Sequence, residues 1–261
     1  MTQELTREKE ITVERDGMRA VLKDRVTVEA ALTIILNGTE LVTLLCTPEK
    51  MDRLALGFLR SEGLLTSMDE VEYLRLREAE GLVEIGFKGG ADLAQQIYGK
   101  RTLTSGCGKG TVFYNTLDSL RSKPVAGRVK LKSEQVFSLM HALQEQASLF
   151  KATGGVHSAA LADENGVILF CEDIGRHNAV DKIVGECLMR QIALDDKILV
   201  SSGRLSSEIL LKAAKLQLPV LLSRAAPTSL SIELAESLNI TLIGFVRGRR
   251  MNIYTHAWRI S

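Results

Sequence analysis

The chain has 261 residues, with 33 Lys and Arg against 32 Asp and Glu. This length fits one large domain or two modest ones, and 45% hydrophobic with 25% charged residues excludes a disordered, collagen-like or coiled-coil chain. The net charge of +1 gives no general attraction to nucleic acid or to a membrane. No apolar run reaches the roughly 18 residues of a membrane-spanning helix.

The first half of the chain is rich in β-branched residues. Strands are predicted at 10–15, 19–23, 27–36 and 40–46, and Asn37-Gly38 marks a hairpin between the last two. A helix is predicted to follow as far as Ser61, with Thr47 as its N-cap and Pro48 in its first turn. Two more strands are expected at 71–77 and 82–87.

A plausible linker at 122–128 separates this half from a second half in which helices and strands alternate. Helical patterns cover 133–150, 176–193, 206–216 and 228–238, and Ser206 and Thr228 suit N-caps. Strand patterns cover 157–162, 167–171, 197–201, 219–222, 240–246 and 252–255. This alternation predicts a mostly parallel sheet covered by helices.

The four cysteines are Cys46, Cys107, Cys171 and Cys187, and no two lie closer than 16 residues, so there is no C-x-x-C pair. Few cysteines and a polar, charged N-terminus without a signal-peptide pattern predict a cytoplasmic setting. Three of the four lie in apolar runs and are expected in the core.

Cys107 is different because it lies in a glycine-rich loop, with a glycine at 106, 108 and 110. Glycine permits sharp bends and close approach to another molecule. Lys100, Arg101 and Lys109 are near, and no acidic residue occurs between Leu93 and Leu117. Nearby cations favour the thiolate. The loop therefore suits a nucleophile that accepts and hands over a group, and a structural loop with an incidental cysteine is the equal alternative.

Arginines recur where strands of the second half end: Arg176, Arg204, Arg224 and Arg247. Ligands of open α/β sheets bind beyond the carboxyl ends of strands, where helix N-termini attract anions. Arginine also suits bidentate phosphate contact. The last 25 residues carry +4 and no acidic residue. The pattern predicts a polyanionic ligand, against the alternative of separate solvated loops.

Two histidines adjoin these loops. His157 follows Gly154-Gly155-Val156, and His177 follows Arg176. Either suits an acid/base or ligand-binding role, or a hydrogen-bonded position at a helix cap. His256 follows the basic turn at 247–250 and is expected near the anion site.

Five motifs occur in this order: SGCG at 105–108, GGVHSAA at 154–160, EDIGRHNAVDK at 172–182, SGR at 202–204 and GFVRG at 244–248. Together they closely resemble the motifs of the sulfur carrier protein FdhD family of formate dehydrogenase accessory proteins. The resemblance covers about residues 20–258. It implies an α+β fold: a strand-rich region at 1–124 with the Cys107 loop, and a three-layer, cytidine deaminase-like α/β domain at 125–261.

The resemblance also implies a function. Such a protein takes persulfide sulfur from a cysteine desulfurase and passes it to the molybdenum (or tungsten) bis(molybdopterin guanine dinucleotide) cofactor before insertion into formate dehydrogenase. Cys107 aligns with the persulfide-forming cysteine. The cofactor-binding stretch aligns with Phe245, Val246, Arg247, Gly248, Arg249 and Arg250. From the residues alone, Arg176, His177, Arg204 and Arg224 are further candidates for the anion site.

One residue departs from the family pattern. Many members have a second cysteine three residues after the first, and here that position is Gly110. A single-cysteine relay is expected. The alternatives are a cofactor- or nucleotide-binding chaperone without sulfur transfer, and a Cys–His acyl-transfer enzyme using His157 or His177. The deaminase signature of H-x-E with P-C-x-x-C is absent, so no zinc or other metal site is expected. A homodimer is the expected oligomer, and a nucleic-acid partner is not expected.

Overall fold

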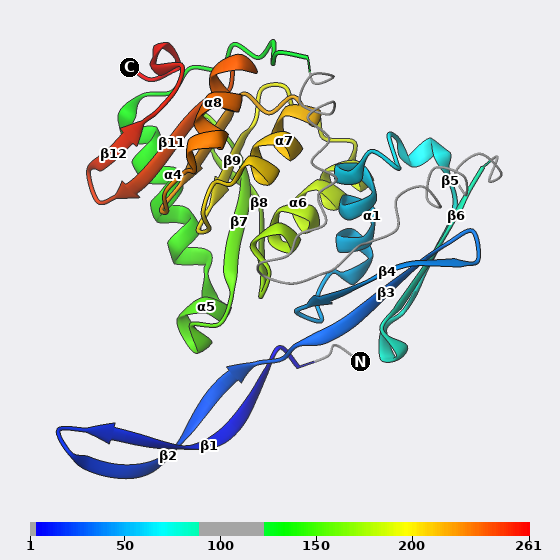
Figure 1. Cartoon of the computed structure of the whole chain (residues 1–261), viewed down its shortest axis with the longest axis vertical. Helices are drawn as coiled ribbons and strands as arrows, with labels where there is room; N and C mark the ends of the chain where they lie inside the picture. The colour runs from blue at the N-terminus through cyan, green and yellow to red at the C-terminus, as the bar shows by residue number, and fades with distance from the viewer. Residues whose placement is uncertain (1–3, 89–122) are drawn as a thin grey trace.

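The computed structural model describes residues 4–88 and 123–261 of the chain. These residues form a two-stranded hairpin, a four-stranded sheet and a six-stranded sheet. Figure 1 shows the hairpin projecting from a body in which both larger sheets are packed against helices. No helix of the described part is long and apolar enough to cross a membrane.

The N-terminal elements follow the sequence pattern closely. β1 (Thr6–Arg15) pairs with β2 (Met18–Thr27), and β3 (Ala30–Leu36) pairs with β4 (Thr39–Cys46). The second hairpin turns at Asn37 and Gly38, which have φ of 48° and 77°. A type I′ turn requires positive φ at both positions, and the Asn-Gly prediction is confirmed. β5 (Val71–Arg77) and β6 (Leu82–Phe87) complete the sheet in the order β4-β3-β6-β5.

The larger sheet has the order β12-β11-β10-β9-β7-β8. Its strands are β7 (His157–Asp163), β8 (Gly166–Asp173), β9 (Ile198–Ser201), β10 (Val220–Ser223), β11 (Thr241–Arg247) and β12 (Arg250–Ile253). β9, β10 and β11 are parallel, but β7, β8 and β12 join antiparallel. The prediction of a mostly parallel sheet is therefore wrong, because β7–β8 and β11–β12 are hairpins at the two edges.

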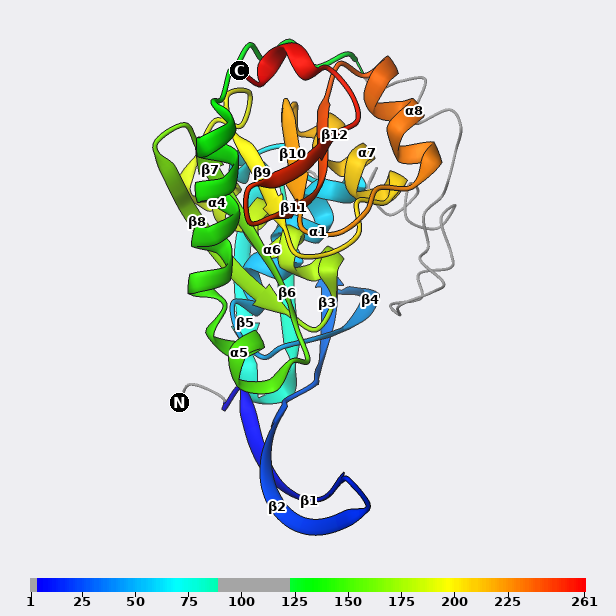
Figure 2. The same ribbon diagram turned by 90° about the vertical axis from the view of Figure 1, so that its left-hand side faces the viewer.

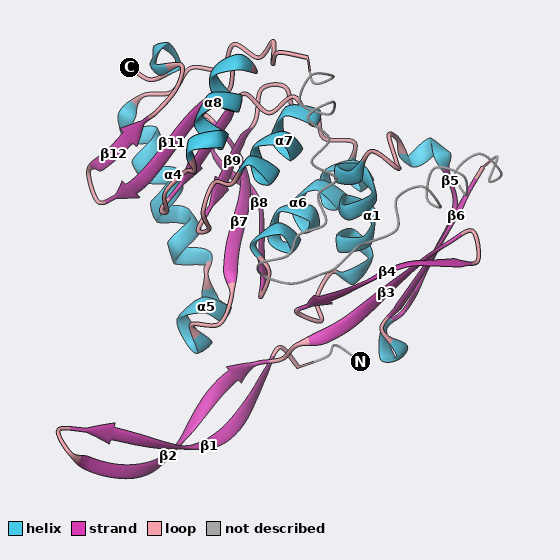
Figure 3. Cartoon of the chain, viewed as in Figure 1, coloured by secondary structure: helices cyan, strands magenta, loops and turns pink. Residues whose placement is uncertain are grey.

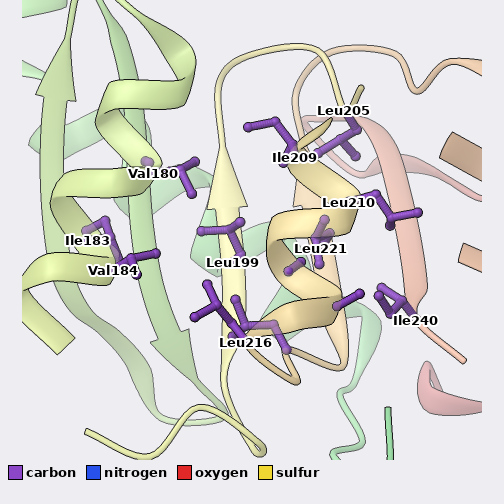
Figure 4. Close-up of a cluster of buried hydrophobic side chains, with 14 of the residues drawn as sticks. Val180, Ile183, Val184, Leu199, Leu205, Ile209, Leu210, Leu216, Leu221 and Ile240 are labelled. Atoms are coloured by element: carbon purple, nitrogen blue, oxygen red, sulfur yellow. The ribbon is translucent and has the colours of Figure 1, made fainter. Parts of the chain in front are cut away.

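Helices cover both faces of this sheet. α4 (Ser133–Gln146) packs on one face, and α6 (Arg176–Arg190), α7 (Ser207–Lys215) and α8 (Ser229–Ser237) lie on the other (Figure 2). Val220 and Leu222 of β10 face α4, while Leu221 between them joins the opposite core, drawn in Figure 4. This alternation shows a strand buried on both faces. The α+β fold with a three-layer unit is confirmed.

α1 (Met51–Glu62) lies between α6 and the four-stranded sheet, as Figure 3 shows. Its apolar residues close the core of that sheet. Two glycines bring the helices together: a Cβ on Gly57 would lie 1.7 Å from Asp181 O, and one on Gly185 would lie 1.9 Å from Arg53 O. The helix backbones therefore touch, and no larger residue fits at either position.

Two helix predictions need correction. The helix expected at 133–150 is interrupted at Ala147, which separates α4 from α5 (Ser148–Thr153). Thr47 is not the N-cap of α1: the helix begins after Lys50, whose φ is 53°, and Thr47 is buried in contacts with β8 and α6. Local preference was overridden in both cases by tertiary contacts of the flanking residues.

The caps of α7 and α8 give a matched stability prediction. Thr228 accepts a hydrogen bond from Ser231 N, whereas Ser206 makes no side-chain cap bond to α7. We expect Thr228→Ala to lower the free energy of unfolding by about 1 kcal/mol. Ser206→Ala is expected to change it by less than about 0.5 kcal/mol. Urea denaturation of the two variants checks this, and equal losses would contradict the assignment of the caps.

Candidate functional site

One edge of the six-stranded sheet collects the loops that carry the predicted anion-binding residues. β8, β9, β10 and β11 end at this edge, and β7 begins there because it runs antiparallel to β8 and β9. The sequence at these strand ends supplies the group we call the basic edge: His157, Arg176, His177, Arg204, Arg224 and Arg247. The fold thus brings together residues that are 90 positions apart in the chain.

The first part of the basic edge is a cluster around His157. Burial lowers the pKa of this half-buried histidine, and the charges of Arg176, His177 and Arg204 lower it further. Such a concentration of positive charge beside a neutral imidazole is typical of a site for an anion. Arg176 Nε is buried and has no hydrogen-bond partner among the described residues.

His177 is held by a carboxylate of the neighbouring helix. Its Nε2 lies 3.0 Å from Oε2 of Glu208 in the first turn of α7, and the pKa of Glu208 is lowered chiefly by this contact. The pair fixes the start of α6 to the start of α7. Neither helix has a side-chain bond to its first N–H groups from the residues that the structure describes. The positive end of α6 therefore adjoins the cluster, whereas Glu208 offsets the positive end of α7.

Backbone contacts connect the cluster to the second part of the basic edge. Ser223 Oγ donates to Gly203 O at 2.6 Å, and Arg224 N donates to Ser201 O at 3.3 Å. Arg247 Nε in turn donates to Arg224 O at 3.4 Å. Arg204, Arg224 and Arg247 are exposed. The loops after β9, β10 and β11 are thus joined to one another, and each presents an exposed arginine, a row that we call the basic strip.

The stretch 245–250 forms the β11–β12 hairpin at the end of that strip. Phe245 has φ of 53° beside a shift of the strand register, and its peptide N–H donates to Ala225 O at 3.1 Å. A left-handed backbone is unusual for a bulky residue and marks a bulge held by its surroundings. Arg247 lies over the Phe245 ring at 5.6 Å, and Gly248 begins the turn with φ of 56°.

A buried ion pair supports the loop that carries Arg176 and His177. Asp173 Oδ2 lies 2.7 Å from Lys182 Nζ and accepts bonds from Thr47 N and Oγ1 at 3.1 and 3.0 Å. Asp173 Oδ1 accepts from Gly175 N and Asn178 Nδ2, both at 2.9 Å. Asp173 and Lys182 are fully buried. These residues fix the β8–α6 loop to the end of β4 instead of facing a ligand.

Other charged residues of the segment 172–182 also have structural contacts. Glu172 accepts the backbone N–H groups of Leu149 and Phe150, both at 2.9 Å, and so caps α5. Asp181 accepts from Ser61 Oγ at 2.6 Å and pairs with Lys212 at 2.6 Å. The segment 172–182 therefore has two kinds of residue. Its carboxylates and Lys182 hold secondary-structure elements together, and Arg176 and His177 lie at the basic edge.

Two basic residues of the C-terminus lie elsewhere. Arg259 is fully buried, donates to Thr241 Oγ1 and Gly127 O at 3.1 and 3.0 Å, and stacks on Trp258. The backbone O of His256 accepts from Thr241 Oγ1 at 3.0 Å. Thr241 begins β11, so both residues lie at the opposite end of that strand from Arg247. The expectation that His256 lies near the anion site is wrong, because the anion-binding candidates lie at the other end of β11.

The described cysteines are poor nucleophiles. Cys46, Cys171 and Cys187 are buried, as predicted. Burial raises the pKa of Cys46 and of Cys187 to about 12, and it also raises that of Cys171. Cys107 lies outside the described residues, so its role stays a prediction. No group of three or more His, Cys, Asp or Glu within 4–88 and 123–261 could hold a metal ion.

These features define an α+β protein with a basic, anion-attracting sheet edge. The model of the FdhD/NarQ family matches residues 27–261. The chain is 43% identical to "Sulfur carrier protein FdhD" of Bacillus subtilis over 260 residues, which cover 100% of this chain and 99% of the relative. It is 44% identical to the protein of that name from Bacillus pumilus, over 95% of this chain and 94% of the relative. The chain therefore belongs to the FdhD/NarQ family.

A solved structure supports the fold independently. A protein from Desulfotalea psychrophila, described as a formate dehydrogenase accessory protein, superposes with a TM-score of 0.81. The superposition covers 99% of this chain and 100% of that one, at 24% sequence identity. The arrangement of both sheets and their helices is thus shared at a low level of sequence similarity.

Proposed function

We propose that this chain is a sulfur carrier that receives sulfane sulfur on Cys107 and delivers it to a molybdenum (or tungsten) bis(molybdopterin guanine dinucleotide) destined for formate dehydrogenase. The names of the relatives support sulfur carriage, and the description of the structural neighbour supports a formate dehydrogenase accessory role. A cysteine desulfurase in the cytoplasm is the proposed donor.

The observation that carries the proposal is the basic edge. The dinucleotide cargo has two pyrophosphates, and phosphate is bound best by arginine and by open helix N-termini. Arg176, His177, Arg204 and Arg224 lie along one edge, and the hairpin of residues 245–250 continues it. We propose that the cargo binds along this strip, with Phe245 held by the bulge for contact with the cargo.

The sulfur chemistry needs one thiolate. The Cys107 thiolate attacks the outer sulfur of the donor's persulfide, the donor S–S bond breaks, and the donor leaves as a thiolate. In delivery, the Cys107 persulfide is the sulfur donor. Its outer sulfur takes two electrons from the Mo(IV) of the reduced cargo, the S–S bond breaks, and the sulfur becomes a sulfide ligand of Mo(VI). Cys107 leaves again as a thiolate. Each step balances with one cysteine, so Gly110 is no obstacle to it.

A cofactor chaperone without sulfur transfer is the second candidate, because Gly110 replaces the second loop cysteine found in many family members. It shares the basic edge with the first candidate and differs in leaving Cys107 dispensable. A homodimer is proposed in both cases, since the cargo has two nucleotide halves.

Sulfur loading tests the proposal. After incubation with a cysteine desulfurase and cysteine, the intact protein is expected to gain about 32 Da, the mass of one sulfur, and reductant should remove it. Cys107→Ala is expected to abolish the gain. Cys171→Ala, which removes a buried thiol of raised pKa, is the matched control and should load normally. A wild-type protein that stays unloaded but binds guanine nucleotides would favour the chaperone.

A further inference from the structure

His157 is the member of the basic edge that begins β7, and its ring lies beside the hydroxyl of Ser202. Ser202 Oγ accepts the backbone N–H of Ser158 at 2.9 Å and lies 3.4 Å from His157 Nδ1. A neutral ring with its proton on Nε2 can accept the Ser202 hydroxyl proton at Nδ1, whereas a protonated ring would donate from Nδ1 to Ser202 Oγ. A histidine that accepts at Nδ1 carries its proton on Nε2 and is neutral.

Burial and the positive charges of two neighbouring elements favour the neutral form of His157. α6 contributes Arg176 and His177, and the β9–α7 loop contributes Arg204. Asp173 of β8 opposes them, but it is paired with Lys182. Glu208 of α7 lies against His177. Protonating His157 would thus add a further positive charge to a half-buried cluster that already contains Arg176 and Arg204.

Backbone shape keeps His157 beside Arg176. Gly203 lies against both side chains: a Cβ there would be 3.0 Å from Arg176 Cβ and 3.5 Å from His157 Nδ1. Arg176 Nε is buried, and no hydrogen bond to it comes from the described part of the chain. The cluster thus combines a histidine of lowered pKa with a guanidinium whose Nε has no partner among residues 4–88 and 123–261.

We propose that His157 is a phosphate-binding residue of the basic edge and takes up a proton from solvent when the phosphate binds. The pyrophosphate of the cargo carries two negative charges, which offset the charges of Arg176 and Arg204 beside the half-buried imidazole. The protonated ring then has two N–H donors, and no covalent bond forms or breaks. The inference rests on the proposed function, because it names the anion as a phosphate of the nucleotide cargo.

Proton uptake can be counted by calorimetry with GDP as the probe. Binding heats at one pH in two buffers of different ionisation enthalpy give the number of protons taken up. We expect wild-type protein to take up a larger fraction of a proton than His157→Gln. His256→Gln, at the far end of β11, should match wild type. Because GDP titrates near pH 6 itself, the difference between variants is the measured quantity.

The sign of the pH dependence follows from the same linkage. Free His157 has a lowered pKa, and bound phosphate raises it, so GDP affinity should fall as pH rises between these two values. The excess slope over His157→Gln is at most about tenfold per pH unit. The His157 ring signal in NMR should show the raised pKa in wild-type protein with GDP, without any substitution.

The results separate this proposal from the function on which it rests. Equal proton uptake by wild type and His157→Gln, or an unchanged ring pKa with GDP bound, would overturn the role of His157. Failure of GDP to bind, with normal loading of Cys107, would overturn it as well and leave sulfur carriage intact. Proton-linked binding without loading of Cys107 would support His157 and reject sulfur carriage.

Discussion

Replacing Gly185 with alanine is expected to lower the free energy of unfolding by about 3 kcal/mol or more. The added methyl would lie 1.9 Å from Arg53 O, a backbone atom of α1 that cannot rotate away. α1 and α6 must then separate, which loosens the contact between the four-stranded sheet and the three-layer unit. For a chain of this size the loss corresponds to a fall in Tm of about 6–12 °C, measurable by scanning calorimetry.

A glycine at the end of α1 provides the control. Gly63 has φ of 77°, and a Cβ there would meet no atom within 4 Å. Gly63→Ala therefore carries the cost of a left-handed alanine alone, about 1 kcal/mol. Gly57→Ala should resemble Gly185→Ala, and the double variant should lose less than the two losses added, because both act on one helix contact. A loss for Gly185→Ala no larger than for Gly63→Ala would show that the helices can move apart freely.

Local sequence signals predicted the elements well. Asn37-Gly38 has the backbone freedom that its turn needs, and the helix and strand patterns of the second half fall within a few residues of the observed bounds. Thr47 failed as a predicted cap because its partners, Asp173 and Lys182, are more than 120 positions away. Cap preference is local, and a buried network formed by distant residues outweighs it.

The candidate site was predictable in part. Arg176, His177, Arg204 and Arg224 were found because strands of one sheet deliver their loops to a common edge. Arg259 is one of the four positive charges in the last 25 residues, but a count of basic residues does not reveal that its guanidinium is buried beside Thr241 and Gly127. The glycines before His157 predicted that a strand begins there. The position of the His157 side chain between Ser202 and Arg176 depends on the pairing of β7 with β9, which is not a local property of the sequence.

The largest effect inside the motif at 172–182 is expected at Lys182. Lys182→Met removes the cation that pairs with Asp173 and leaves a buried carboxylate without an opposite charge, at a cost of about 3–5 kcal/mol. Asp173→Asn should cost a similar amount, because it leaves the buried ammonium with Thr47 and the Glu172 carbonyl as its partners. Urea denaturation measures both losses.

The double variant Asp173→Asn/Lys182→Met decides whether charge pairing is the cause. Without either charge it should be more stable than each single variant, since neither ion is then buried alone. The exposed pair of Lys23 and Glu8, 3.5 Å apart, is the surface control, and Lys23→Met should cost less than about 1 kcal/mol. A Lys182→Met loss as small as that of Lys23→Met would contradict a buried ion pair.

Asp173 also accepts hydrogen bonds from Gly175 and Asn178, so Asp173→Asn should weaken GDP binding at Arg176 and His177 as well. The double variant should regain stability without regaining GDP affinity, because it still lacks the Asp173 carboxylate. The free energy of unfolding would then report the ion pair of Asp173 with Lys182, and GDP affinity would report the positioning of the β8–α6 loop by Asp173.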